Sequence, residues 1–126
     1  MAKITGIGGI FFKTRDREAS KAWYRDTLGI DMTDYGVTLK FADAGADAYA
    51  VLSPFDAGTG YFDPSPHALM MNLRVDDLDA LLAELAAKGV NVLGRQDESY
   101  GKFAWIMDPD GIKLELWQQI GPAPDA

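Results

Sequence analysis

A pattern of β-strand, helix cap, helix and glycine stop occurs twice in this chain, once in each half. FFKTRD (residues 11–16) and NLRVDD (residues 72–77) each combine a β-prone run, a basic residue and an aspartate suited to cap a helix. AWYRDTLGI ends at Ile30 and LAELAAKGV ends at Val90, and both contain the glycine that a left-handed helix end favours. An internal repeat of this kind predicts two similar structural units.

Each half also carries several β-prone runs around its helix. The helices are expected from Asp16 to Leu28 and from Asp76 or Asp77 to Lys88. Each sheet would have one face covered by its own helix and one face open, so the two open faces oppose each other across a cleft. The expected fold class is α+β, with two tandem βαβββ units. The predicted strands are residues 7–15, 30–33, 37–42 and 48–53, then 68–75, 90–94, 103–107 and 112–118.

The length of 126 residues suits one domain. Residues 54–66 are rich in Pro, Gly and Asp and lack an amphipathic period, which is typical of a linker. Two aromatic residues of this linker, Tyr61 and Phe62, either cover a pocket or pin the linker to the core, and we favour the second interpretation. The expected organisation is a single domain (1–126) with a first βαβββ unit (4–53), a linker (54–66), a second unit (67–118) and a C-terminal tail (119–126).

Glu115 is a carboxylate placed where an inward-facing residue is expected. Residues 103–117 alternate in polarity on both sides of Asp-Pro-Asp-Gly (residues 108–111), which predicts a β-hairpin with a tight turn. With a period of two, Glu115 shares a face with Trp105 and Trp117. A charge on an inward face is costly unless it has a partner, so Glu115 is expected to interact with another polar or charged group.

Several partners are open to Glu115. It could pair with Arg74, Lys13 or Lys113, or it could receive a cationic ligand. It could instead transfer protons if burial favours its neutral form. A buried salt bridge with no function is the competing interpretation.

Three segments carry a resemblance to a known family. They are WYRDTLGI (residues 23–30), RVDDLDALLAELAAKGV (residues 74–90) and DPDGIKLELW (residues 108–117), in that order around the duplicated pattern. With these motifs the chain resembles the vicinal oxygen chelate superfamily, which includes glyoxalase I, bleomycin-resistance proteins and extradiol dioxygenases. The resemblance extends from Ile4 to Gln118 and implies the paired βαβββ units and the cleft.

The resemblance also implies where a metal would bind. In metal-using members a divalent ion takes one ligand from each of four strands, and these positions correspond here to Gly9, Val51, Met70 and Glu115. Only Glu115 has a side chain that binds hard divalent ions well. His67 lies three residues before Met70 and is expected at the surface or at a strand edge. No cofactor is therefore expected, and a divalent metal held by Glu115 with unrecognised ligands is the alternative.

A ligand pocket is expected on the strand faces that carry these positions. The family orientation and the period of two make it aromatic and apolar with a few polar groups, which is typical of a small-molecule site. Glu115 is the candidate catalytic residue. The expected pocket residues are Phe11, Lys13, Asn72, Arg74, Tyr100, Trp105, Met107, Glu115 and Trp117.

Composition excludes several classes of function. The formal net charge of −7 argues against nucleic acid, whose phosphates would repel the chain. The chain has no cysteine, which excludes disulfides, thiol nucleophiles and thiolate metal sites. No signal peptide or membrane-spanning segment is recognised, so we expect a cytoplasmic protein without a membrane partner. Open sheet edges favour a homodimer.

Three functions are compatible with these features. The first is a metal-free binding protein of the bleomycin-resistance type, which holds a small aromatic or cationic molecule in its cleft. The second is a divalent-metal-dependent lyase, isomerase or dioxygenase that uses Glu115. The third is a dimeric structural or regulatory protein with a vestigial cleft. The sequence leaves open whether the protein is an enzyme.

Overall fold

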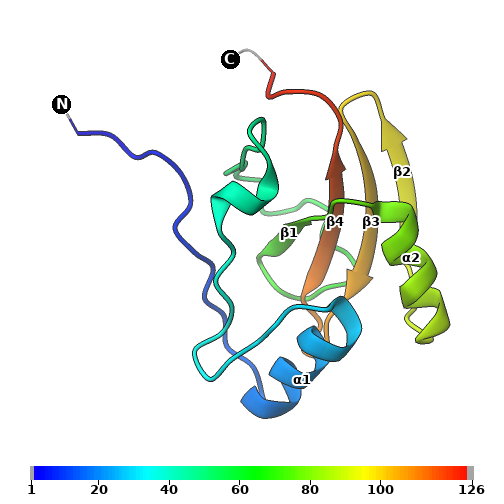
Figure 1. Ribbon diagram of the computed structural model, residues 1–126. Coiled ribbons are helices and arrows are strands. Elements are labelled where there is room, and N and C mark those ends of the chain that lie inside the picture. Colours follow the sequence, from blue (N-terminus) through cyan, green and yellow to red (C-terminus); the bar gives the residue numbers. More distant parts are fainter. Residues whose placement is uncertain (1, 125–126) are drawn as a thin grey trace.

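The computed structural model describes residues 2–124, and in that range it contains two α-helices and one mixed four-stranded sheet (Figure 1). The expected α+β class is confirmed. Met1 and the last two residues of the predicted tail, 125–126, lie outside the described residues. The elements are α1 (Arg17–Leu28), the 3-10 helix η1 (Phe41–Ala44), β1 (Met70–Arg74), α2 (Leu78–Ala87), β2 (Gly94–Glu98), β3 (Gly101–Met107) and β4 (Lys113–Gln119).

The second half of the chain forms a βαβββ arrangement, but the strand predicted at 90–94 is found later, at Gly94–Glu98, because these are the residues that pair with β3. The strand order is β1-β4-β3-β2, with β1 parallel to β4 and the other neighbours antiparallel. Strand β4 is therefore flanked on both sides, and Glu115 lies between Asn72 of β1 and Trp105 of β3 in register. The sheet alone brings these three side chains to one place.

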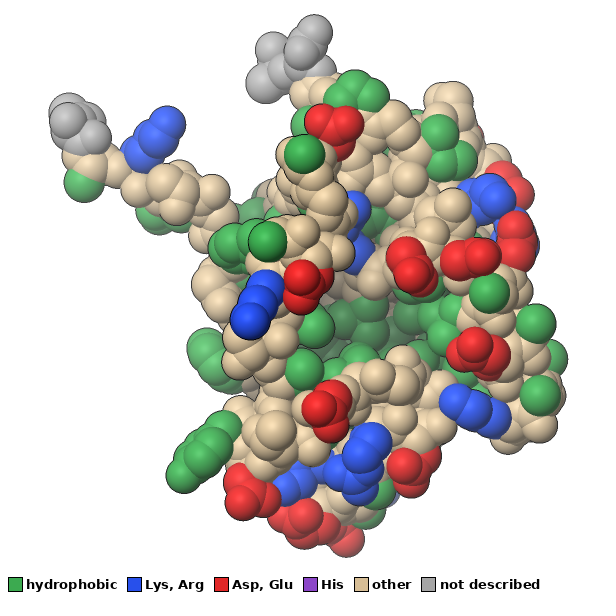
Figure 2. Space-filling view, in the orientation of Figure 1, with side chains coloured by type: hydrophobic (Ala, Val, Ile, Leu, Met, Phe, Trp, Pro, Cys, Tyr) green, Lys and Arg blue, Asp and Glu red, His purple; other side chains and the backbone are tan. Residues whose placement is uncertain are grey.

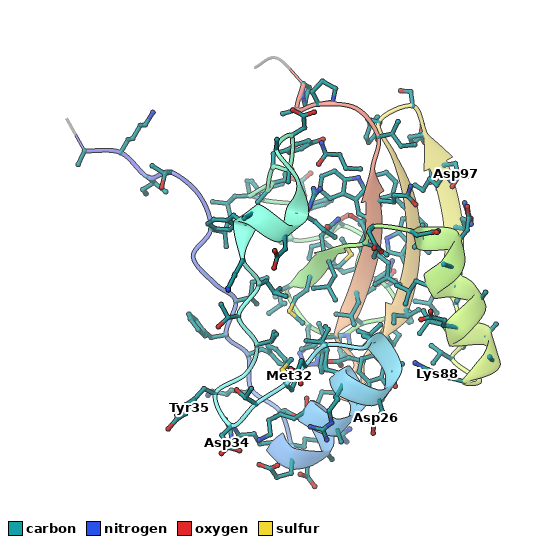
Figure 3. All side chains as sticks on the ribbon, viewed as in Figure 1. Asp26, Met32, Asp34, Tyr35, Lys88 and Asp97 are labelled. Atoms are coloured by element: carbon teal, nitrogen blue, oxygen red, sulfur yellow. The ribbon has the colours of Figure 1, made fainter. Side chains whose placement is uncertain are left out.

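Both helices begin and end near the residues that the sequence indicates. The Asp16 carboxylate accepts a hydrogen bond from the N–H of Ala19, and the Asp77 carboxylate accepts one from Ala80. Gly29 ends α1 with a φ of 69°, a left-handed conformation that glycine adopts without a Cβ clash. At the end of α2, Lys88 extends towards α1 (Figure 3), and its Nζ donates to the carbonyl oxygen of Thr27 at 3.2 Å.

Different parts of the chain lie over the two faces of the sheet. Both helices lie on the near side of the sheet in Figure 1, while the segment that leads into β1 passes behind it. On the helix side, Figure 2 shows a hollow in which hydrophobic side chains are visible. Close packing of apolar side chains on this side supplies the main folding free energy. The largest fully buried side chains are Leu78, Leu85, Ile106, Leu114 and Leu116.

The Asp-Pro-Asp-Gly turn ties the two halves of the chain together. Asp108 is buried, and its Oδ1 accepts hydrogen bonds from the N–H groups of Asp110 and Ile112, each at 2.9 Å. The hydroxyl of Tyr24 on α1 donates to Oδ2 of Asp108 at 2.8 Å, and burial together with this carboxylate raises the pKa of Tyr24. Gly111 has a φ of 80°, as the predicted turn requires.

Asp110 supplies a further contact at the same turn. Its carboxylate accepts hydrogen bonds from the Thr14 hydroxyl and from the Arg15 side chain, and these bonds lower the pKa of Asp110. The start of α1 is thus fixed to the β3–β4 hairpin through polar contacts.

The predicted strands of the first half are not formed in the described part of the chain. Residues 7–15, 37–42 and 48–53 contain no strand, and residues 30–33 contribute only one isolated bridge, between Thr33 and Gly36. The tandem arrangement with opposed sheets is therefore not confirmed. The physical reason is that a β-prone segment becomes a strand only beside another strand that takes its backbone hydrogen bonds. These segments and their flanks leave large apolar side chains exposed, among them Ile4, Phe11, Leu39, Phe41, Val51 and Leu52.

Candidate functional site

Glu115 is buried in a set of neutral hydrogen-bond donors. The side chain is 8 % exposed. Its Oε1 accepts from Nδ2 of Asn72 at 2.7 Å, and its Oε2 accepts from Nε1 of Trp105 at 2.8 Å and from the hydroxyl of Tyr61 at 2.6 Å. An ionised carboxylate only accepts hydrogen bonds, so three facing donors satisfy the carboxylate form. All three of these donors are neutral groups.

The side chains around Glu115 come from β1, β3 and β4. We call this surface the Glu115 face: the side of the sheet away from the helices that carries Asn72, Trp105, Lys113, Glu115 and Trp117. Alternation along each strand sends these residues to one side and Leu114 and Leu116 to the other. The period of two therefore predicted the composition of this face.

Lys113 is a second buried charge on the Glu115 face. The side chain is 9 % exposed, and its Nζ donates to the backbone oxygen of Tyr61 at 2.6 Å. The same ammonium lies 5.2 Å from the ring centroid of Tyr61 and 5.6 Å from that of Trp105, within the range of cation–π attraction. Tyr61 thus contacts both charged residues, Lys113 through its carbonyl and ring and Glu115 through its hydroxyl.

Trp117 anchors an aromatic group at the other end of the face. Its ring lies parallel to that of Phe103 with centroids 6.3 Å apart, and it meets the Tyr49 ring edge to face with centroids 5.2 Å apart. The Arg74 guanidinium lies 4.9 Å from the Trp117 ring centroid. The indole ring also leans over Gly101, and within the described residues its Nε1 has no hydrogen-bond partner.

The charged partners expected for Glu115 are not found. Within residues 2–124, no ion pair involves Glu115, so Lys13, Arg74 and Lys113 do not pair with it. Lys113 instead contacts Tyr61, and Arg74 contacts Trp117 and the carbonyl oxygen of Tyr49. A buried salt bridge, the competing interpretation for Glu115, is not formed among these residues, and its hydrogen bonds come instead from neutral donors on β1, on β3 and in the linker.

The residues around Glu115 do not fit a divalent metal ion. Among residues 2–124, no three His, Asp or Glu side chains are grouped as a metal site would require. The Trp105 indole N–H and the Asn72 amide N–H are hydrogen-bond donors that cannot act as ligands. His67 lies at the hairpin turn instead, where its Nε2 is 2.9 Å from the carbonyl oxygen of Asp110.

The structure brings together some of the predicted pocket residues and separates others. Asn72, Arg74, Trp105, Met107, Glu115 and Trp117 come from the three strands that form the Glu115 face. Tyr100 lies at the β2–β3 turn, and its ring meets the edge of Phe103 with centroids 5.8 Å apart. Lys13 lies on the exposed N-terminal segment, and Phe11 is 94 % exposed and lines a separate hollow of about 260 Å³ beside α1. The role of these residues in ligand binding stays a prediction.

Tyr61 is the residue whose role the pocket prediction missed. It belongs to the linker, and its ring stacks on Phe55 with centroids 5.5 Å apart while its edge meets Trp105. Burial and the Glu115 carboxylate raise the pKa of Tyr61, which keeps its hydroxyl protonated as a donor. The sequence feature that could have indicated this role is the presence of an aromatic residue in a Pro- and Gly-rich linker, because such linkers seldom need aromatic residues.

Comparisons with known proteins agree with this architecture. Residues 6–116 match the family model described as the Glyoxalase/Bleomycin resistance protein/Dioxygenase superfamily. No curated protein matches the chain. Neither of the described α-helices has the length and apolar character that crossing a membrane demands.

Several solved structures are similar to this one. TnmS3, an antibiotic binding protein from Streptomyces sp. CB03234, is 26 % identical over 95 % of this chain and 100 % of its own, with a TM-score of 0.60. A protein from the mobile metagenome of V. Pseudocholerae is 14 % identical over 96 % of this chain and 99 % of its own, with a TM-score of 0.64. A member of the same superfamily from Sphaerobacter thermophilus is 17 % identical over 84 % of this chain and 90 % of its own, with a TM-score of 0.50. The last two show similarity of fold alone.

Proposed function

This chain belongs to the Glyoxalase/Bleomycin resistance protein/Dioxygenase superfamily, and we propose that it is a binding protein that holds a small aromatic molecule on its Glu115 face without a metal ion. The observation that carries this proposal is the setting of Glu115, a buried carboxylate with three neutral donors among aromatic rings. Apolar surface with a few oriented polar groups is the usual make-up of a small-molecule site.

The charge on Lys113 favours an aromatic ligand over a cationic one. Its ammonium is buried against the rings of Tyr61 and Trp105. A ligand cation placed on these rings would meet a like charge in a poorly solvated environment, which is unfavourable. A neutral ring would keep the cation–π contact of Lys113 and could still donate a hydrogen bond to Glu115.

The similarity to an antibiotic binding protein supports binding rather than catalysis. TnmS3 matches this chain over nearly the full length of both proteins. For the present chain we propose only that it captures a small organic molecule. We also propose that the family's metal is not used here, since Gly9, Val51 and Met70 occupy the positions at which the family resemblance implies ligands.

Calorimetric titration with 2-naphthol, a neutral planar ring, and with proflavine, a planar aromatic cation, tests this function. We expect saturable 1:1 binding of 2-naphthol and weaker binding of proflavine. Trp105→Phe removes ring area and an N–H and should weaken 2-naphthol binding by about tenfold. Trp23→Phe, on α1, is the matched control and should leave binding unchanged. The proposal fails if 2-naphthol gives no saturable heat, or if both variants bind it equally.

We also propose that two copies of the chain associate as a homodimer. The support is the exposed apolar residues of the extended first half, Phe11 and Leu52 among them, and the open edge of β1. A second copy could cover both by pairing strands at that edge. Sedimentation should give twice the mass of one chain, and Phe11→Asp with Leu52→Asp should halve it. Asp26→Lys, a charge change on an exposed position, should not, and a monomeric unmodified protein would contradict the proposal.

The division into the units 4–53 and 67–118, with the linker 54–66 and the tail 119–126, stays a prediction. The cytoplasmic location is likewise a proposal, which fractionation of expressing cells would test.

A further inference from the structure

We infer that the Glu115 face recognises a phenolic ring, and that Tyr61 of this chain occupies the recognition site as an internal phenol. This inference rests on the proposed function and names the chemical class of the ligand. The Tyr61 hydroxyl donates to Oε2 of Glu115 at 2.6 Å, while its ring meets Trp105 edge-on with centroids 6.1 Å apart. A bound phenol would make the same two contacts.

The surroundings of the Tyr61 side chain are those of a ligand rather than of a core residue. The ring lies between the Trp105 indole, the Lys113 ammonium and the stacked ring of Phe55. The side chain nevertheless remains 41 % exposed, so solvent reaches it. An aromatic ring that packs on three sides and opens to water on another has the burial pattern of a molecule that enters from outside.

The segment that carries Tyr61 does not pair with the sheet as a strand. Residues 54–66 contain turns but no helix or strand. The backbone hydrogen bonds within this segment are short-range, such as Asp63 N–H to Gly60 and Ser65 N–H to Phe62. Tyr61 supplies the polar contacts of this segment to Lys113 and Glu115. Displacement of this one residue would remove one hydrogen bond from each of these two charged side chains.

These two charged side chains define the ligand further. Glu115 would need a hydrogen-bond donor to replace the Tyr61 hydroxyl, and Lys113 would need an acceptor to replace the Tyr61 carbonyl. The two residues lie two positions apart on β4, a separation of about 7 Å along the strand. The fitting class is therefore a hydroxylated aromatic molecule that also carries a carbonyl or similar acceptor.

Removal of the Tyr61 side chain tests the inference directly. Tyr61→Ala should open a site for p-cresol, which is the Tyr side chain as a free molecule. By ligand-observed NMR and melting temperature, p-cresol should bind Tyr61→Ala at least tenfold more tightly than the unmodified protein, where Tyr61 competes. Toluene, which has the same ring without the hydroxyl, should bind Tyr61→Ala at least tenfold more weakly than p-cresol. Adding Glu115→Gln should remove this preference.

Tyr35→Ala is the matched control, because Tyr35 is 99 % exposed and projects from the loop after α1 (Figure 3). This variant should bind p-cresol as the unmodified protein does. Equal affinity of Tyr61→Ala for p-cresol and toluene would overturn the inference and leave the proposed function standing. If neither p-cresol nor toluene bound to Tyr61→Ala, both the inference and the proposed function would be overturned.

Tyr61→Phe provides a second measurement should Tyr61→Ala fail to fold. It keeps the ring contacts with Phe55 and Trp105 and deletes only the hydroxyl bond to Glu115. With its internal competitor weakened, the protein should bind 2-naphthol about tenfold more tightly than before. An unchanged affinity in a folded Tyr61→Phe variant would overturn the inference.

Discussion

Replacing Gly101 with alanine is expected to displace Trp117 and to lower the free energy of unfolding by about 3 kcal/mol. An added Cβ at Gly101 would overlap Nε1 of Trp117, lie 2.8 Å from its Cδ1 and lie 3.2 Å from the backbone oxygen of Gln118. The indole is almost fully buried against Tyr49 and Phe103, so it has no free volume into which to move. Chemical denaturation gives the free energy, and near-ultraviolet circular dichroism reports the indole.

Gly94→Ala is the control for this experiment. Gly94 also lies on a strand beside a tryptophan, but an added Cβ there would lie 3.8 Å from Cε3 of Trp105, an ordinary van der Waals contact. Its free energy of unfolding should change by less than about 1 kcal/mol, the scale of strand propensity. Equal losses in the two variants would show that the clash with Trp117 is not the cause.

Replacing Asp108 with alanine is expected to lower the free energy of unfolding by about 4 kcal/mol. The change leaves the N–H groups of Asp110 and Ile112 and the hydroxyl of Tyr24 without their acceptor. A buried donor without a partner costs about 1–3 kcal/mol, and a domain of this size has only about 5–15 kcal/mol in total. Thermal and chemical denaturation should show a protein close to the limit of stability.

Tyr24→Phe separates the contributions at Asp108. It deletes the hydroxyl bond to Asp108 but keeps the two N–H bonds of the turn, so the loss should be about 1–2 kcal/mol. Asp34→Ala, at an exposed carboxylate, should leave stability nearly unchanged. If Asp108→Ala proved no more costly than Tyr24→Phe, the turn bonds would not be the source of stability.

The sequence predicted those parts of the fold that depend on local chemistry. Asp16 and Asp77 cap helices because their side chains reach N–H groups three residues away. Gly29 and Gly111 lie where the backbone needs a positive φ. The alternation along β3 and β4 assigned Trp105 and Glu115 to the same face because successive residues of a strand point in opposite directions.

The sequence did not predict features that depend on distant partners. The β-prone runs of the first half remain without strand neighbours, although their composition resembles that of true strands. The contact of Tyr61 with Glu115 joins residues 54 positions apart, and no periodicity in the linker encodes it. The neutral donors around Glu115 follow from register and from the path of the linker, both of which are tertiary properties.

The position of β4 in the sheet has a consequence for biosynthesis. Within residues 2–124, strand β1 lies at the sheet edge and pairs only with β4, and register partners such as Asn72 and Glu115 are 43 positions apart. At about 5–20 residues per second, a ribosome needs roughly several seconds to add β4 once β1 has been made. Met70, Met71 and Leu73 have no neighbouring strand during that interval, and an unpaired apolar strand is a target for aggregation or for a chaperone. The pairing of β1 therefore cannot be completed until the last strand of the sheet has been made.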